Sequence, residues 1–130
     1  KQKSNWGNKG MAKVLVVDDS PSEMAKFREI LSRNNHEVIE AYTGEEGILK
    51  SKELQPDLIL MDIVMPEMNG FQATRQISRS VETKHIPVVI VSTKSQETDR
   101  VWGKRQGAKE YLTKPVNEEE LMRVIQSVME

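Results

Sequence analysis

The chain has 130 residues, 37% of them hydrophobic, which predicts one domain with a single core. A net charge of −1 argues against nucleic acid or an anionic membrane as a partner, and without cysteines there are no disulfides or thiolate metal sites. No apolar stretch approaches the ~20 residues that cross a bilayer, and no signal peptide is visible, so we expect a cytoplasmic protein.

The first ten residues differ from the rest of the chain. They are polar, contain two glycines and show no periodicity. We interpret residues 1–10 as a disordered tail or a cloning remnant, and residues 11–130 as the folded domain. Trp6 is the exception within this segment, because a lone tryptophan in a tail can dock on a protein surface.

The folded part begins with a strand, a helix and a second strand. Residues 13–17 form a short apolar run that predicts a strand. Ser20 and Glu23 then have the spacing of an N-cap and an N3 residue, which predicts the start of a helix. Two asparagines at 34–35 end this helix, and residues 36–41 are rich in β-formers.

The middle of the chain repeats the pattern. Thr43 is predicted to cap a second helix, in which Ile48 and Leu49 are expected on the buried side. Residues 58–61 predict the third strand, and Gly70 opens the third helix after a loop.

The last part contains two more strands and two more helices. Residues 87–91 are the most apolar strand and are expected in the centre of the sheet. A weaker helix over 95–106 is expected to stop at Gly107, a short strand covers 110–113, and Asn117 caps the last helix. Five strands alternating with five helices predict an α/β fold with a parallel sheet covered on both faces.

Polar side chains directly follow or end four of the predicted strands. Asp18 and Asp19 follow the first strand, Asp62 the third and Lys114 the fifth, while Ser92 lies at the end of the fourth. Each alone would be an ordinary turn or loop residue. Because the carboxyl ends of parallel strands meet at one edge of the sheet, the five together predict a single site.

The composition of this site indicates phosphoryl chemistry. Clustered carboxylates repel one another, so the cluster requires a cation. Oxygen ligands alone favour a hard ion, above all Mg²⁺. The Lys114 ammonium would hold the remaining oxygens of a phosphoryl group, and an aspartate is a suitable nucleophile to form an acyl phosphate.

Four segments carry a family resemblance: VLVVDDS, LILMDIVMPEMNG, VVIVST and YLTKP. Residues 11–130 resemble the receiver domain of two-component response regulators. Two longer segments, MDIVMPEMNGFQATRQ and ETDRVWGKRQGAKEYLTKPV, resemble the stand-alone receivers of type IV pilus chemosensory systems, of the PilH kind. The resemblance implies a flavodoxin-like, doubly wound (βα)₅ fold with strand order 2-1-3-4-5. It also implies a role in twitching motility.

The resemblance assigns a role to each candidate residue. Asp62 would accept a phosphoryl group from a histidine kinase, which we expect to be of the chemotaxis type. Asp18, Asp19, Asp62 and the backbone carbonyl of Val64 would hold Mg²⁺, and Lys114 would contact the phosphoryl group. On this basis the protein is not an enzyme with a separate substrate, but assists its own phosphorylation and dephosphorylation.

The resemblance also implies a switch. Ser92 matches the switch hydroxyl and Tyr111 the switch aromatic, and the Lys114–Pro115 peptide is typically cis in this family. Phosphorylation would reshape the face formed by the fourth helix, the fifth strand and the fifth helix, where a downstream protein would bind. Since the sequence ends after its last helix, we expect no DNA-binding or enzymatic output domain.

Three alternatives remain open at this point. The protein could act as a phosphate sink or phosphorelay intermediate. It could be a small phosphatase of the haloacid dehalogenase type, although that class uses Asp-x-Asp and Asp18 and Asp19 are adjacent. It could bind a nucleotide or flavin, although a phosphate-binding loop is expected after the first strand in that case.

Overall fold

The computed structural model describes residues 11–130 and contains the alternating elements that the sequence predicts; residues 1–10, including Trp6, lie outside the described residues. The elements are β1 (Lys13–Val17), α2 (Pro21–Arg33), β2 (Glu37–Ala41), α3 (Gly44–Leu54), β3 (Leu58–Met61), α4 (Gly70–Arg79), β4 (Val88–Ser92), α5 (Glu97–Arg105), β5 (Glu110–Thr113) and α6 (Glu118–Met129). None of these helices has both the length and the apolar character that crossing a bilayer requires.

The five strands form one parallel sheet in the order β2-β1-β3-β4-β5, which confirms the predicted order. The expectation that the fourth strand occupies the centre is only partly right. β4 is an interior strand between β3 and β5, but the middle position belongs to β3. All five residues of β4 and all four of β3 are buried, so apolar character does not distinguish the two positions.

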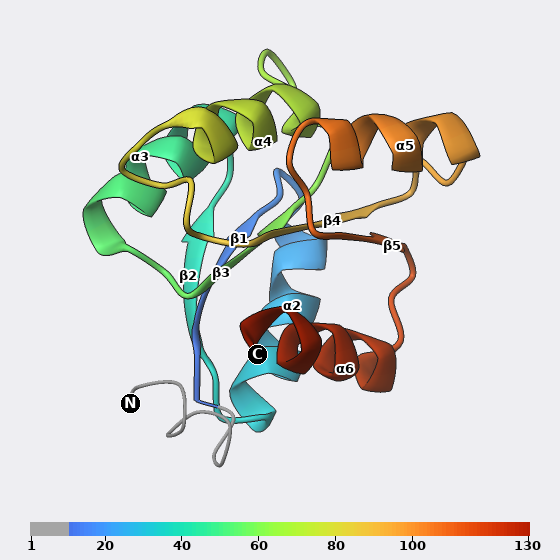
Figure 1. Cartoon of the computed structure of the whole chain (residues 1–130). Helices are drawn as coiled ribbons and strands as arrows, with labels where there is room; N and C mark the ends of the chain where they lie inside the picture. The colour runs from blue at the N-terminus through green and yellow to red at the C-terminus, as the bar shows by residue number, and fades with distance from the viewer. Residues whose placement is uncertain (1–10) are drawn as a thin grey trace.

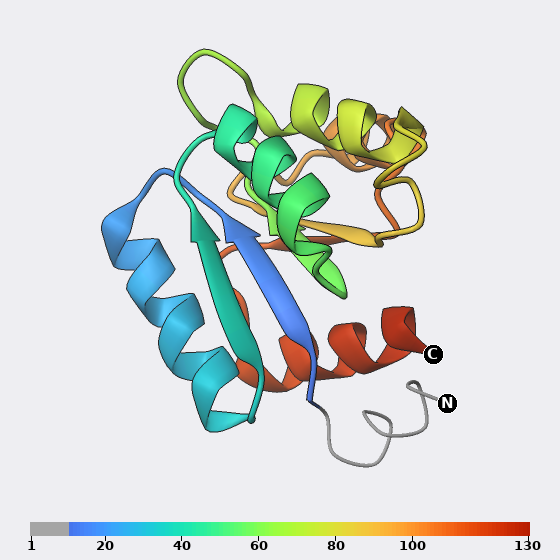
Figure 2. The same cartoon turned by 90° about the vertical axis from the view of Figure 1, so that its left-hand side faces the viewer.

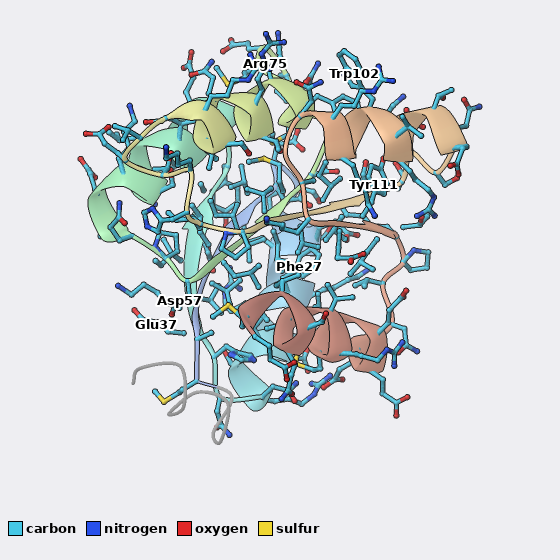
Figure 3. The ribbon with its side chains drawn as sticks, in the orientation of Figure 1. Phe27, Glu37, Asp57, Arg75, Trp102 and Tyr111 are labelled. Atoms are coloured by element: carbon cyan, nitrogen blue, oxygen red, sulfur yellow. The ribbon has the colours of Figure 1, made fainter. Side chains whose placement is uncertain are left out.

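Helices cover both faces of the sheet, as predicted. Figure 1 shows α3, α4 and α5 on one face and α2 and α6 on the other, and Figure 2 shows α2 running beside β1 and β2. Successive strand residues point to opposite faces. In β1, Val14 and Val16 pack in the core beneath α2 and α6, whereas Leu15 and Val17 join the core beneath α3 and α4. Phe27 of α2, labelled in Figure 3, belongs to the same core as Val14 and Val16.

Polar caps begin the helices where the sequence indicates. The side chains of Ser20, Thr43 and Asn117 each accept a hydrogen bond from the backbone N–H three residues further on. At the other end of α5, Gly107 has a φ of +115°, a left-handed conformation that favours glycine and ends the helix as predicted.

Helix α3 presents a different side to the core than expected. Leu49 was predicted to be buried but is 53% exposed. The buried side of α3 contains Gly44, Gly47 and Ser51 instead, with Ile48 partly buried. A Cβ atom on Gly47 would lie 2.8 Å from Cγ2 of Val17, so the helix packs on β1 through its glycines and leaves Leu49 on the outer side.

Candidate functional site

The sheet itself places the candidate residues side by side. The backbone N–H of Asp62 donates to the carbonyl of Val17 at 2.9 Å, and that of Lys114 donates to the carbonyl of Ser92 at 2.9 Å. The hydrogen-bonded ladder therefore extends one residue beyond the ends of β3 and β5. Asp18 follows Val17 in the same register, so the polar residues share one edge of the sheet, as predicted.

The three aspartates form a compact acidic cluster. Asp18, Asp19 and Asp62 each offer a carboxylate oxygen, and these atoms lie within 4.8 Å of one another. Asp18 and Asp62 are buried, whereas Asp19 is exposed to solvent. Such a set of hard oxygen donors, two of them buried, fits a divalent cation such as Mg²⁺. Val64 lies two residues beyond Asp62, and this residue is 56% exposed.

Lys114 provides the positive charge at the centre of the cluster. Its Nζ lies 2.7 Å from Oδ2 of Asp18, 3.6 Å from Oδ2 of Asp62 and 3.8 Å from Oε1 of Glu23. Burial acts to lower the pKa of Lys114, but the hydrogen bond to Asp18 and the charges of Asp62 and Asp18 outweigh it and raise the pKa. The ammonium group therefore stays protonated and within reach of both buried carboxylates.

Asp62 is held with one oxygen fixed and the other beside Lys114. Its Oδ1 accepts a hydrogen bond from the backbone N–H of Ile63 at 2.8 Å. Burial raises the pKa of Asp62, Lys114 acts in the opposite direction, and the neighbouring Asp18 raises it further. The Asp62 carboxylate is thus less stable in its charged form than a solvated aspartate, which is typical of functional sites.

Glu23 is a member of the site that the sequence analysis did not identify. It was recognised only as the N3 residue of α2, and its backbone N–H does bond to Ser20. Its carboxylate also approaches Lys114 because α2 begins directly above the acidic cluster. No sequence signal reveals this second contact, because it depends on the angle at which α2 leaves the sheet.

Ser92 and Tyr111 are connected through one residue. Ser92 is fully buried, and its Oγ accepts a hydrogen bond from the backbone N–H of Lys94 at 3.3 Å. The Tyr111 hydroxyl donates to the backbone carbonyl of the same Lys94 at 2.6 Å. Tyr111 is itself buried in a small core cluster with Ile63 and Ile90, and the Lys114–Pro115 peptide is cis as expected.

Comparison with known proteins gives a consistent result. The family description "Response regulator receiver domain" matches residues 14–126. The chain is 56% identical to Protein PilH of Pseudomonas aeruginosa over 119 residues, covering 92% of this chain and 98% of that protein. The resemblance to receivers of the PilH kind is therefore confirmed.

Solved structures agree with the sequence relatives. The chemotaxis protein CheY4 of Vibrio cholerae superimposes with a TM-score of 0.85 at 34% identity, covering 91% of this chain and 98% of that one. The receiver domain of sensor histidine kinase PA1611 from Pseudomonas aeruginosa, described with a magnesium ion coordinated in its active site cleft, gives a TM-score of 0.84 at 25% identity, covering 91% and 97%. With its parallel sheet and the acidic cluster at the strand ends, the chain belongs to the response regulator receiver domain family.

Proposed function

We propose that the protein is a single-domain response regulator that accepts a phosphoryl group from a histidine kinase on Asp62. The observation that carries this proposal is the position of the Asp62 carboxylate. It is buried, lies within 4.8 Å of two other carboxylates, and has a lysine ammonium 3.6 Å from its Oδ2. Oδ2 of Asp18 lies 2.7 Å from Nζ of Lys114, and Oδ1 of Asp18 accepts a hydrogen bond from the backbone N–H of Ser20. Oδ2 of Asp62 lies farther from Nζ of Lys114, at 3.6 Å, and is therefore the less tightly bound oxygen.

The proposed transfer step uses this geometry. Oδ2 of Asp62 attacks the phosphorus atom of a phosphohistidine, a new P–O bond forms, and the P–N bond breaks. The imidazole nitrogen leaves with the electron pair of that bond and is then protonated. Lys114 neutralises negative charge on the transferred group, because its Nζ lies beside the attacking oxygen.

A metal ion completes the charge balance in this proposal. Asp18, Asp19, Asp62 and the backbone carbonyl of Val64 would hold Mg²⁺. Bound there, the ion would supply Lewis-acid stabilisation of the phosphoryl oxygens. The donor set supports this assignment, since it contains only oxygen atoms and its carboxylates carry more negative charge than Lys114 compensates.

The signal would leave the site through Ser92 and Tyr111. In the proposed switch, the Ser92 hydroxyl binds a phosphoryl oxygen, and the change passes through Lys94 to the hydroxyl of Tyr111. Tyr111 lies on the face formed by α5, β5 and α6, which we propose as the binding surface for a downstream protein. This face contains a cleft of about 220 Å³, lined by Glu97, Arg100, Val101, Lys104, Glu110 and Tyr111.

The pathway is proposed from the relatives. The 56% identity to Protein PilH supports a role in type IV pilus motility, with a chemotaxis-type histidine kinase as the phosphoryl donor and the cytoplasm as the location. Residues 11–130 would provide the entire receiver domain.

Intact-mass measurement after incubation with acetyl phosphate and Mg²⁺ tests the proposed acceptor. We expect the parent protein to gain the mass of one phosphoryl group, and Asp62→Asn to gain none. Asp57→Asn is the matched control, because Asp57 lies directly before β3 and Asp62 lies directly after it. This variant should react like the parent. Equal phosphorylation of Asp62→Asn and the parent would overturn the assignment.

A further inference from the structure

Arg100 of α5 makes two contacts with Tyr111 and one with Thr113, which lies two residues further along β5. Its guanidinium carbon lies 5.4 Å from the centre of the Tyr111 ring. Its Nη1 donates to the backbone carbonyl of Tyr111 at 3.3 Å, and its Nη2 donates to Oγ1 of Thr113 at 2.8 Å. The guanidinium group thus lies over the ring at cation–π distance while two of its nitrogens donate to the strand that carries the ring, a combination that a lysine side chain cannot reproduce.

The backbone of α5 also approaches the Tyr111 ring, at Gly103. A Cβ atom on Gly103 would lie 2.8 Å from Cδ1 of Ile90 and 3.1 Å from Cδ2 of Tyr111. The helix therefore lies directly against the ring, and the ring is confined between α5 and the sheet. Figure 3 shows Tyr111 on the inner side of α5, whereas Trp102 of the same helix points outward.

These contacts are independent of the acidic cluster. The atoms that Arg100 binds belong to Tyr111 and Thr113 of β5, and neither the cation–π contact nor the hydrogen bonds involve Asp62 or Ser92. The atoms nearest to a Cβ on Gly103 likewise belong to Tyr111 and Ile90. Contacts from α5 therefore stabilise the buried position of Tyr111 without involving the residues of the acidic cluster.

We propose that Arg100 is a positioning residue that keeps Tyr111 buried by contacts independent of Asp62, and so shapes the cleft between α5 and β5. This inference rests on the proposed function, in which Tyr111 reports the state of Asp62. Arg100 and Tyr111 both line the cleft, so a change in one alters the surface that a partner would meet. Phosphorylation of Asp62 would further favour the buried position of Tyr111. Without Arg100, the burial of Tyr111 would depend on phosphorylation.

Fluorine NMR of protein labelled with fluorotyrosine tests the proposal, because the chain contains only two tyrosines. Tyr42→Phe removes the other one and leaves a single resonance from Tyr111. We expect one buried resonance in this background, insensitive to a soluble paramagnetic relaxation agent. Arg100→Ala should add a second, solvent-accessible resonance of comparable intensity. Beryllofluoride with Mg²⁺, a mimic of the phosphoryl group, should return that signal to the buried position.

Two further variants separate positioning from folding. Arg100→Lys keeps the charge but loses the double hydrogen bond, so it should show the accessible resonance at lower intensity. Arg123→Ala removes an exposed arginine of α6 and should leave the spectrum of Tyr111 unchanged. Circular dichroism of each variant identifies general unfolding.

The possible failures are distinguishable. A single buried resonance in both Arg100→Ala and Arg100→Lys would overturn the role of Arg100, as would an equal effect of Arg123→Ala. If Arg100→Ala shows the accessible resonance and beryllofluoride with Mg²⁺ leaves it in place, the proposed coupling of Tyr111 to Asp62 is wrong. The spectra recorded without beryllofluoride would still decide whether Arg100 positions Tyr111.

Discussion

Replacing Asp62 with asparagine should raise the free energy of unfolding when magnesium is removed with a chelator. At an effective dielectric constant of about 20, Lys114 at 3.6 Å attracts the Asp62 carboxylate by about 5 kcal/mol. Asp18, at no more than 4.8 Å, repels it by about 3.5 kcal/mol or more. Exposed Asp19 adds a screened repulsion, and burial penalises the charge further.

The repulsion from Asp18 and Asp19 and the burial penalty together exceed the attraction by Lys114. Removing the charge of Asp62 should therefore raise the free energy of unfolding by about 1–2 kcal/mol. Lys114 keeps its hydrogen bond to Asp18 at 2.7 Å in the variant, so its own charge remains paired. Magnesium should reduce the difference, because binding at ten times Kd stabilises the parent by about 1.4 kcal/mol. The variant lacks one of the ligands and should gain less.

Urea unfolding followed by far-ultraviolet circular dichroism measures both effects, with and without magnesium. Asp57→Asn is the control for loss of one negative charge near the same strand, since an asparagine oxygen can still accept the hydrogen bond from the backbone of Lys13. We expect it to change the free energy of unfolding by less than about 0.5 kcal/mol. A variant at position 62 that is no more stable than the parent in chelator would refute the electrostatic reasoning.

Three other predictions concern single residues. The Nδ1 atom of His36 accepts a hydrogen bond from the backbone N–H of Ala12, and burial lowers the pKa of His36. The free energy of unfolding should therefore fall as the pH drops below about 6.5, and His36→Asn should flatten this pH dependence in urea unfolding. Thr74 has a buried hydroxyl with no partner in residues 11–130, whereas that of Thr83 donates to a carbonyl at 2.8 Å. Thr74→Val should therefore be neutral or stabilising and Thr83→Val should cost about 1–3 kcal/mol, and equal losses in urea would contradict this. A Cβ on Gly70 would lie 1.9 Å from the carbonyl oxygen of Asp62. Gly70→Ala should therefore lower the melting temperature and slow phosphorylation by acetyl phosphate. An unchanged phosphorylation rate would show that the close approach of Gly70 to Asp62 is not needed for the reaction.

The strand-end site could be predicted because two simple patterns coincide. Short apolar runs identify strands, and a parallel sheet brings their carboxyl ends to one edge. Asp18, Asp62 and Lys114 follow such runs directly, so their proximity depends on the sheet and on little else. The distances of Lys114 to both carboxylates agree with this reasoning.

Other features depend on packing that local patterns do not encode. Leu49 has the spacing of a buried residue, but α3 contacts β1 through Gly47 and turns that side chain outward. The contact between Glu23 and Lys114 depends on the direction of α2, and that between Arg100 and Tyr111 on how closely α5 approaches β5. Strand order similarly depends on the crossover connections, so β3 and not the equally buried β4 occupies the middle of the sheet.

The central claim is that Asp62 is the residue that receives the phosphoryl group. Reduction of the phosphorylated protein with borohydride converts an aspartyl phosphate to homoserine, and peptide mapping by mass spectrometry then identifies the modified position. The account predicts homoserine at Asp62 after incubation with acetyl phosphate and Mg²⁺, and none when Mg²⁺ is replaced by a chelator. Homoserine at Asp18 or Asp19, or at a position outside the acidic cluster, would contradict it.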